Sequence, residues 1–249
     1  MATVGIIGGS GLDDPDIVQN IRETRVETPY GWPSSPVTQG TVGGVEVLLI
    51  SRHGKNHELS PAEVNYRANI HALKQSGATC IIATTACGSL RQEIQRGDLV
   101  ILDQFIDFTR KRINTFHDSF SNGVVHVSPA DPFDKTLSAL LFTAAKKLNF
   151  PVHPSGTVVT IEGPRFSTRA ESRMFRLWGG DVINMSIAPE AALACEAGIP
   201  YATVAMSTDY DCWKDDEDPV SWDEILAVFK SNAEKVKQLL ITVISAMKA

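Results

Sequence analysis

The sequence predicts an α/β fold, a single domain over residues 1–249 with a mainly parallel, twisted central sheet flanked by helices on both faces. Three observations predict it. Short apolar segments of the length of buried strands recur along the chain. Longer amphipathic segments alternate with them, as in strand–helix–strand units. The length of 249 residues fits one domain with a sizeable core.

In the first third of the chain, strands are expected at residues 4–7 and 45–50. The first strand ends in Gly-Gly-Ser-Gly at 8–11. Residues 14–44 hold several prolines and glycines and are expected to be irregular. The capping box Ser-Pro-Ala-Glu at 60–63 predicts a helix that begins there and runs to about residue 75.

The stretch at 80–89, Cys-Ile-Ile-Ala-Thr-Thr-Ala-Cys-Gly-Ser, starts as a buried strand and ends in hydroxyl residues and a glycine. In open α/β sheets, ligands bind at the carboxyl ends of such strands. A simple turn at Gly88 explains the same residues equally well. The next strand is expected at 99–102. Residues 109–133 form a long polar loop, which in a compact domain usually closes a site or contacts a partner subunit.

The rest of the chain alternates helices and strands. Two more capping boxes, at 168–171 and 221–224, mark helix starts. The expected elements are a helix at 134–147, a strand at 156–161, a helix from 168 to about 178, a strand at 181–185, a helix at 189–197, a strand at 201–206 and a final helix from 221.

Composition excludes several classes of protein. The net charge of −6 argues against a nonspecific nucleic-acid binder. The four cysteines have neither CxxC nor zinc spacing and are expected to be free thiols. The N-terminal residues show no basic leader and no apolar span is long enough for a membrane, so a cytoplasmic protein is expected.

His53 and His57 have helical metal-pair spacing, but Gly54 lies between them and no HExxH glutamate is present, so no metal is expected.

The glycine turn at 8–11 invites a dinucleotide-binding interpretation, but the third glycine position of that motif holds Asp14. No acidic residue closes a second strand about 20 residues on. A single phosphate suits the turn better, with Ser10 as a donor beside approachable N–H groups. A plain tight turn remains an alternative, and a dinucleotide-dependent oxidoreductase remains a rival function.

Oxyanion-binding chemistry has candidates at four expected strand ends. Together they predict a site that binds an oxyanion through hydroxyl and backbone donors, supplemented by one basic pair, rather than through a metal. Taken alone, the basic pair would fit a solvated loop. The candidates are Ser10, Arg52 with His53, Thr85 with Ala86, and Ser186.

Two further segments suggest recognition of an aromatic ligand. Phe166 lies at a strand-to-helix turn, where a ring either stacks on a base or packs in the core. Asp209 and Asp211 follow the apolar strand at 201–206. They are either site carboxylates or part of a solvated acidic loop, since residues 215–218 are also acidic.

Six motifs together carry a family resemblance: Gly-Gly-Ser-Gly at 8–11, Arg-His-Gly at 52–54, Thr-Ala-Cys-Gly-Ser at 85–89, Gly-Pro-Arg-Phe at 163–166, Asn-Met-Ser at 184–186 and Thr-Asp-Tyr-Asp at 208–211. In this order and spacing, the chain resembles the trimeric purine nucleoside phosphorylases, in particular the 5′-methylthioadenosine phosphorylase branch. The resemblance spans residues 4–226. It implies phosphorolysis of 5′-methylthioadenosine to adenine and 5-methylthioribose 1-phosphate, with phosphate as co-substrate and no cofactor.

The resemblance also implies residue roles. Phosphate would be held by Ser10, Arg52, His53, Thr85, Ala86 and Ser186. Met185 would pack on the ribose, Phe166 would stack near the base, and Ser167 would lie beside it. Asp209 and Asp211 would read the purine edge and assist its departure, with Asp209 at N7. In the implied homotrimer, His126 would reach a neighbouring subunit's substrate. Trp222 and Leu226 would line the substrate pocket, Trp222 at its 5′ end.

Two positions separate the branches of the resembled family. The 6-oxopurine enzymes carry glutamate where this chain has Ser167 and asparagine where it has Asp209. An ionised carboxylate only accepts hydrogen bonds, which suits a 6-amino group and opposes a 6-carbonyl. A 6-oxopurine nucleoside phosphorylase is the alternative.

Two features of the sequence depart from the resembled family at the 5′ pocket, and one rival function uses the same residues. Trp222 replaces a smaller residue of the 5′ pocket, and the sequence ends at Ala249 without the extension that helps close this pocket in longer relatives. The 5′ substituent is therefore less firmly implied than phosphorolysis. A non-catalytic nucleoside or phosphate sensor would keep the same binding residues.

Overall fold

The computed structural model describes residues 2–8, 18–121, 123–215 and 222–248. The side chains of residues 222–227 and 229–231, within the last helix, lie outside this description.

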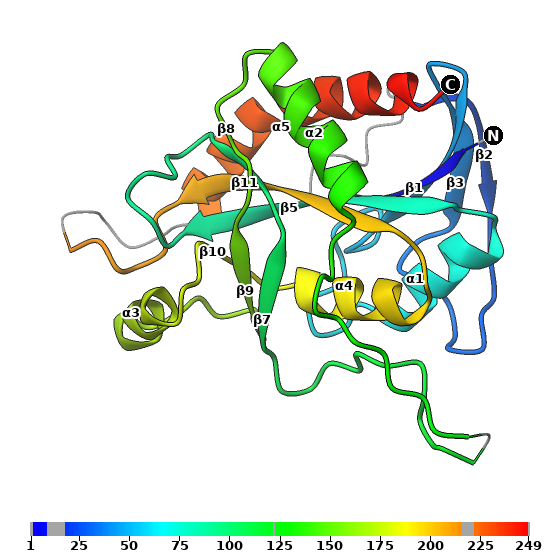
Figure 1. Cartoon of the computed structure of the whole chain (residues 1–249), viewed down its shortest axis with the longest axis horizontal. Coiled ribbons are helices and arrows are strands. Elements are labelled where there is room, and N and C mark those ends of the chain that lie inside the picture. The colour runs from blue at the N-terminus through cyan, green and yellow to red at the C-terminus, as the bar shows by residue number, and fades with distance from the viewer. Residues whose placement is uncertain (1, 9–17, 122, 216–221, 249) are drawn as a thin grey trace.

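A mixed sheet forms the centre of the molecule, and its described part has 11 strands (Figure 1). The pairings of β1 with β4 and of β5 with both β1 and β11 are parallel, whereas β2, β3 and β4 pair antiparallel. The strands are β1 Thr3–Gly8, β2 Gln19–Thr24, β3 Val37–Val42, β4 Val45–Ser51, β5 Cys80–Ser89, β6 Leu99–Ile101, β7 Gln104–Phe108, β8 Val152–His153, β9 Thr157–Ile161, β10 Val182–Asn184 and β11 Tyr201–Asp209.

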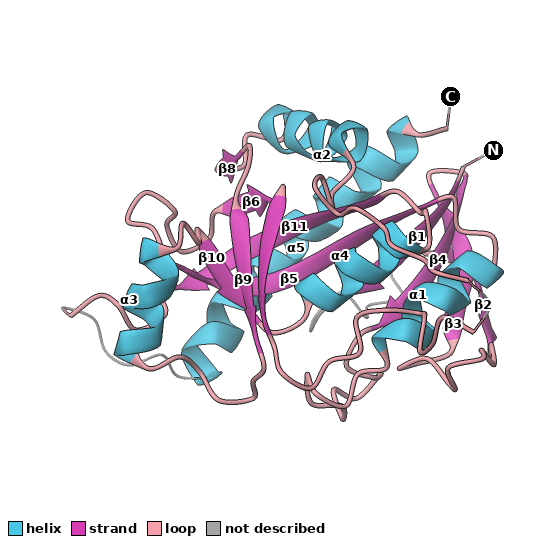
Figure 2. Cartoon of the chain, turned by 60° about the horizontal axis from the view of Figure 1, so that its bottom comes forward, coloured by secondary structure: helices cyan, strands magenta, loops and turns pink. Residues whose placement is uncertain are grey.

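Helices cover both faces of the sheet, as predicted. Figures 1 and 2 show α2 and α5 together on one face, α1 and α4 together on the other, and α3 at one end. The helices are α1 Tyr66–Gln75, α2 Lys135–Lys147, α3 Arg169–Leu177, α4 Ile187–Glu196 and α5 Trp222–Ala246. None of the described helices combines the length and apolar character that crossing a bilayer requires.

The core consists of apolar layers on the two sides of the sheet. Ile6 of β1 belongs to the same buried cluster as Leu141 of α2 and Leu240 of α5. Its neighbour Ile7 belongs to the cluster that contains Ile70 of α1. Successive side chains of a strand point to opposite faces, so a strand buried on both sides reads as a continuous apolar run. This is why β1 and β5 were recognisable from sequence.

The prediction that residues 14–44 are irregular is wrong for the described part. β2 and β3 form an antiparallel extension of the sheet beyond β4. The residues of β2, Gln-Asn-Ile-Arg-Glu-Thr, are almost all exposed. An edge strand with little buried surface needs no apolar alternation, so its sequence resembles a loop. The short strands β7 and β8 were not expected either.

The three capping boxes have different outcomes. At 168–171 the box opens α3 with both reciprocal hydrogen bonds, as predicted. At 60–63 it closes only a single turn, and α1 begins at Tyr66 because Asn65 accepts a hydrogen bond from the Ala68 N–H at 3.1 Å. The predicted start at residue 60 is therefore wrong. The box at 221–224 begins outside the described residues.

The sheet opens along one edge of β5. On this edge β1 pairs with residues up to Ala83, and β10 pairs antiparallel with Gly88 and Ser89, while β11 occupies the opposite edge. Among the described strands, none pairs with residues 84–87 on the open edge. Diverging neighbours at a strand's carboxyl end leave space and free backbone groups for a ligand.

Candidate active site

A cavity of about 600 Å³ lies at the open edge of β5. It brings together most of the residues that the sequence singled out, although β4, β5, β10 and β11 are far apart along the chain. The predicted residues that line it are Arg52, His53, Thr85, Ala86, Phe166, Ser167, Met185, Ser186, Asp209 and Asp211.

Four predicted site residues are not among the described lining residues. Ser10 lies outside the described residues, and so do the side chains of Trp222 and Leu226. His126 is exposed, and its ring lies 5.5 Å from that of Phe120. It does not line the cavity of its own chain. Figure 1 shows its segment, in green, extending away from the sheet.

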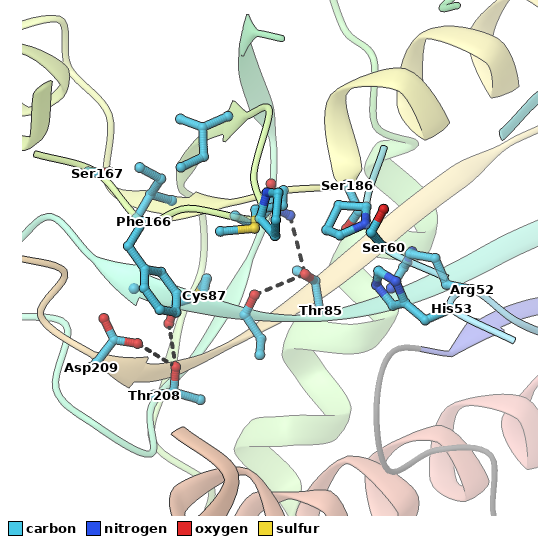
Figure 3. A pocket seen from close by; sticks show the side chains of 18 of the residues that line it. Arg52, His53, Ser60, Thr85, Cys87, Phe166, Ser167, Ser186, Thr208 and Asp209 are labelled. Atoms are coloured by element: carbon cyan, nitrogen blue, oxygen red, sulfur yellow. Dashed lines mark hydrogen bonds between the residues drawn. The ribbon is translucent and has the colours of Figure 1, made fainter. Parts of the chain in front are cut away.

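The cavity has two chemically distinct ends (Figure 3). Arg52, His53 and Ser186 lie at one end, and Phe166 and Asp209 lie at the other. The first end presents hydrogen-bond donors and a histidine, and the second presents carboxyl groups beside an aromatic ring.

Arg52 is held by a buried partner that sequence reasoning missed. Its side chain is 1% exposed and pairs with both oxygens of Glu190, Nε donating to Oε1 at 2.5 Å and Nη2 to Oε2 at 3.0 Å. Nη1 donates to the Thr84 carbonyl oxygen at 2.8 Å. Although burial opposes the charge, Glu190 holds the pKa of Arg52 above its ordinary value. The charge of Arg52 is therefore fixed but compensated.

Glu190 itself lies in α4 with 0% of its surface exposed, and it also accepts a hydrogen bond from the Tyr201 hydroxyl at 2.8 Å. The one available signal in the sequence was a carboxylate within the apolar run Ile-Ala-Pro-Glu-Ala-Ala-Leu-Ala. A buried carboxylate requires a charge partner, but the run does not indicate which one.

His53 presents a neutral imidazole. Its Nδ1 lies 2.9 Å from the Leu59 carbonyl oxygen, which can only accept, so Nδ1 carries the proton. Burial, together with the nearby charge of Arg52, lowers the pKa of His53 to about 4. The ring is therefore uncharged near neutral pH, with Nε2 unprotonated.

The hydroxyl groups at this end lie around the start of a helix. Ser186 is the N-cap residue of α4, so the N-terminus of that helix lies beside the cavity. Within its first turn, the Ala188 N–H donates to the Thr160 hydroxyl at 3.1 Å and Pro189 has no N–H. Helix N-termini favour bound anions. The Thr85 hydroxyl donates to the Ala86 carbonyl oxygen at 3.0 Å and accepts from Asn184 Nδ2 at 3.2 Å. It would have to rotate in order to donate to a ligand.

Met185 also lines the cavity, and it is positioned by Gly163 and Arg112. Gly163 approaches so closely that a Cβ there would come 2.5 Å from the Met185 sulfur, and its φ is +65°. Arg112 donates through Nη1 to the Met185 carbonyl oxygen at 3.1 Å and to the Tyr66 hydroxyl at 2.6 Å. Its side chain is 2% exposed. No motif distinguished Arg112 from the other basic residues of its segment.

At the other end, Asp209 is held in a fixed orientation. Its Oδ1 accepts the Asp211 N–H and its Oδ2 accepts the Thr208 hydroxyl, both at 2.7 Å. Gly88 makes room for it, because a Cβ at that position would lie 2.8 Å from Oδ1. Asp209 is the last residue of β11, so the strand extends three residues beyond its predicted end.

Asp211 completes an acidic pair. Burial raises the pKa of its carboxyl, and the neighbouring Asp209 raises it further. Two close carboxyl groups take up protons as a coupled pair. The raised pKa of Asp211 favours its protonated form, which can donate a hydrogen bond, whereas an ionised carboxylate only accepts. Phe166 is 42% exposed at this end of the cavity, so it is not a core residue in this chain.

The described residues contain no group of three or more His, Cys, Asp or Glu side chains placed to hold a metal ion. All four cysteines are free thiols, as predicted. The residues that line the cavity suit an oxyanion at one end and a polar aromatic group at the other.

Comparison with known proteins gives consistent results. A profile of the Phosphorylase superfamily matches residues 3–245. The S-methyl-5′-thioadenosine phosphorylase of Xenopus tropicalis is 55% identical over 250 residues, which cover 99% of this chain and 89% of that protein. The protein of the same name from Drosophila melanogaster is 50% identical, over 97% of this chain and 84% of its own length.

Solved structures agree with the sequence comparison. The methylthioadenosine phosphorylase of Schistosoma mansoni in complex with adenine has a TM-score of 0.94 and 41% identity, covering 99% of this chain and 92% of that chain. A mutant of the adenosine/methylthioadenosine phosphorylase from the same organism, in complex with methylthioadenosine, has a TM-score of 0.92 at the same identity and coverage. The predicted nucleoside phosphorylase-like fold is confirmed.

Proposed function

The chain belongs to the phosphorylase superfamily, and on that premise we propose that it cleaves 5′-methylthioadenosine with inorganic phosphate to give adenine and 5-methylthioribose 1-phosphate. It is a purine nucleoside phosphorylase of the pentosyltransferase type. The observation that carries the proposal is a single cavity with anion-binding chemistry at one end and an acidic pair beside an aromatic ring at the other. Relatives at about 50% identity named for this activity support the choice of nucleoside.

Phosphate occupies the end formed by β4, β5 and the start of α4. The Ser186 hydroxyl donates to its oxygens, the N-terminus of α4 favours its negative charge, and Arg52 contributes the N–H groups that Glu190 and Thr84 leave unused. The ribosyl group lies over Met185. Phosphate is thereby held beneath C1′, which converts an encounter of two solutes into a reaction between oriented neighbours.

In the reaction, a phosphate oxygen forms a bond to C1′ as the bond from C1′ to N9 of the purine breaks. The bonding electrons leave with the purine. The acidic pair of Asp209 and Asp211 stabilises this charge by hydrogen-bonding or protonating N7 and accepts from the 6-amino group. No covalent enzyme intermediate, metal or cofactor takes part.

The direct test is the phosphate requirement. We expect adenine release from methylthioadenosine to depend on inorganic phosphate and to yield a pentose 1-phosphate. Ser186→Ala should raise the KM for phosphate about tenfold, because a hydrogen bond to a charged group is lost, with a smaller effect on the KM for nucleoside. Ser155→Ala, at an exposed position outside the cavity lining, is the control. Equal turnover without phosphate, yielding free sugar, would identify a hydrolase instead.

We further propose a homotrimer in which the 109–133 segment of each chain reaches a neighbouring active site and brings His126 to the substrate. His126 lies outside its own cavity, and its segment exposes several apolar side chains. Exposed apolar residues concentrated on one segment favour an interface between subunits. They are Ile113, Phe120, Val124, Val125 and Val127, each 38–69% exposed.

Sedimentation equilibrium tests this assembly. We expect a particle of about three times the 27.1 kDa chain mass. Val124→Asp should weaken assembly by placing a charge in the interface, and activity should fall with it as the enzyme is diluted. His126→Ala should leave the mass unchanged and raise the KM for the nucleoside. A fully active monomer would remove His126 from the site.

We place the enzyme in the cytoplasm, where its free thiols would stay reduced. The products assign it to purine and methionine salvage. A 6-oxopurine activity is the remaining competitor, and a panel of methylthioadenosine, adenosine, inosine and methylthioinosine distinguishes the two.

A further inference from the structure

We propose that His53 makes the oxyanion end of the cavity selective for an anion that carries a proton, so that hydrogen phosphate and hydrogen arsenate bind more tightly than the fully ionised sulfate and selenate. This inference rests on the proposed function only in taking the Arg52 end of the cavity as the phosphate site. It concerns which oxyanion fits there and how it is oriented.

The tautomer of His53 carries the argument. The Leu59 carbonyl oxygen, 2.9 Å from Nδ1, accepts the only proton of the neutral ring. Nε2, on the opposite side of the ring, has a lone pair and no hydrogen-bond partner among the described residues. Figure 3 shows the ring projecting toward the side of the cavity on which Thr85 lies. An oxygen without a proton would meet this lone pair with its own, whereas a P–O–H group would donate to it.

Charge does not compensate for such a mismatch. The guanidinium of Arg52 is paired with both oxygens of Glu190 at 2.5 and 3.0 Å. The imidazole of His53 is neutral, because burial and Arg52 keep its pKa near 4. The hydroxyls of Ser60, Thr85 and Ser186, which also line the cavity, and the start of α4 carry no formal charge. His57 is the further ionisable side chain that the described lining places beside His53. Hydrogen-bond complementarity therefore decides which tetrahedral anion binds.

The same contact orients the nucleophile. With its P–O–H group donating to His53, phosphate turns its ionised oxygens away from the ring and toward the hydroxyl and amide donors and the sugar. An ionised oxygen is the one that attacks C1′. His53 neither gives nor takes a proton in this step, so its role is to position phosphate and to determine specificity.

The test uses two matched pairs of anions. At neutral pH, phosphate and sulfate have similar size and shape, but only phosphate retains a proton, and arsenate and selenate differ in the same way. Binding of each anion to the protein alone is measured by titration calorimetry at constant ionic strength. We expect phosphate and arsenate to bind at least about tenfold more tightly than sulfate and selenate, since the wrong partner leaves a buried lone pair unmatched.

Three variants assign the preference to His53. In His53→Asn the amide can turn its NH₂ group toward any anion, so the preference should fall to less than about threefold, mainly through tighter sulfate binding. In His53→Phe, phosphate binding should weaken toward that of sulfate. His153→Asn is the control, because His153 lies in β8 outside the residues that line the cavity, and it should keep the wild-type preference.

Equal affinity of the wild type for phosphate and sulfate overturns the inference. An unchanged preference for phosphate over sulfate in both His53 variants also overturns it, provided that circular dichroism shows a native fold for each variant. These outcomes are separable from a failure of the proposed function. A protein that prefers phosphate but does not cleave methylthioadenosine supports the inference and refutes the function. Phosphate-dependent cleavage of methylthioadenosine by a protein without a preference for phosphate over sulfate supports the function and refutes the inference.

Discussion

Replacing Asp209 with asparagine is expected to lower the ratio of kcat/KM for methylthioadenosine to that for methylthioinosine by about 10- to 100-fold. An ionised carboxylate accepts from a 6-amino group, whereas an asparagine NH₂ faces it donor to donor and instead suits a 6-carbonyl. An unmatched buried polar contact costs about 1–3 kcal/mol, which corresponds to this loss of discrimination. The rate with methylthioadenosine should also fall, because the acidic pair loses a member that can hold the proton for N7.

Steady-state kinetics with both nucleosides at saturating phosphate measures this ratio. Asp215→Asn is the matched control, since Asp215 lies in the same acidic segment but is exposed and pairs with Arg169 and Arg173. Adding Ser167→Glu to Asp209→Asn should strengthen the shift, because the 6-oxopurine enzymes of the resembled family carry glutamate at that position. If Asp209→Asn leaves the ratio unchanged, Asp209 does not read the purine.

Replacing Glu190 with alanine is expected to destabilise the protein by about 3–5 kcal/mol. Arg52 is 1% exposed, and without Glu190 its charge would remain buried with the Thr84 carbonyl oxygen as the remaining acceptor for its side chain among the described residues. The Tyr201 hydroxyl would lose its acceptor as well. Urea unfolding at fixed protein concentration measures the change. Asp131→Asn, which breaks the exposed ion pair with Lys135, is the control and should have little effect.

A double variant separates stability from function. Replacing a buried ion pair with apolar residues of similar volume is often neutral or stabilising. Arg52→Met with Glu190→Leu should therefore recover most of the lost stability, while phosphate binding remains weak because the N–H donors of Arg52 are gone. Normal phosphate affinity in this double variant would show that the pair is purely structural.

The local sequence pattern was sufficient to predict the strands that are buried on both faces and the helices that begin with a strong cap. The apolar runs at β1, β4, β5 and β11 are recognisable because both sides of each strand pack against the core. The exposed strand β2 carried no such signal, and its formation depends on pairing with β3. The turn at 60–63 satisfied a capping pattern, but Asn65 outcompeted it as the start of α1.

The sequence by itself determined which chemical groups stand at the strand ends, because a residue type and its distance from an apolar run are local properties. Arg52, His53, Ser186 and the acidic pair were identified in this way. Only the tertiary structure decided how those groups act. Glu190 neutralises Arg52 across 138 residues, and Arg112 holds Met185 across 73. The Leu59 carbonyl oxygen fixes the His53 tautomer. These partners depend on which strands and loops become neighbours when the sheet assembles, and local periodicity carries no information about that order.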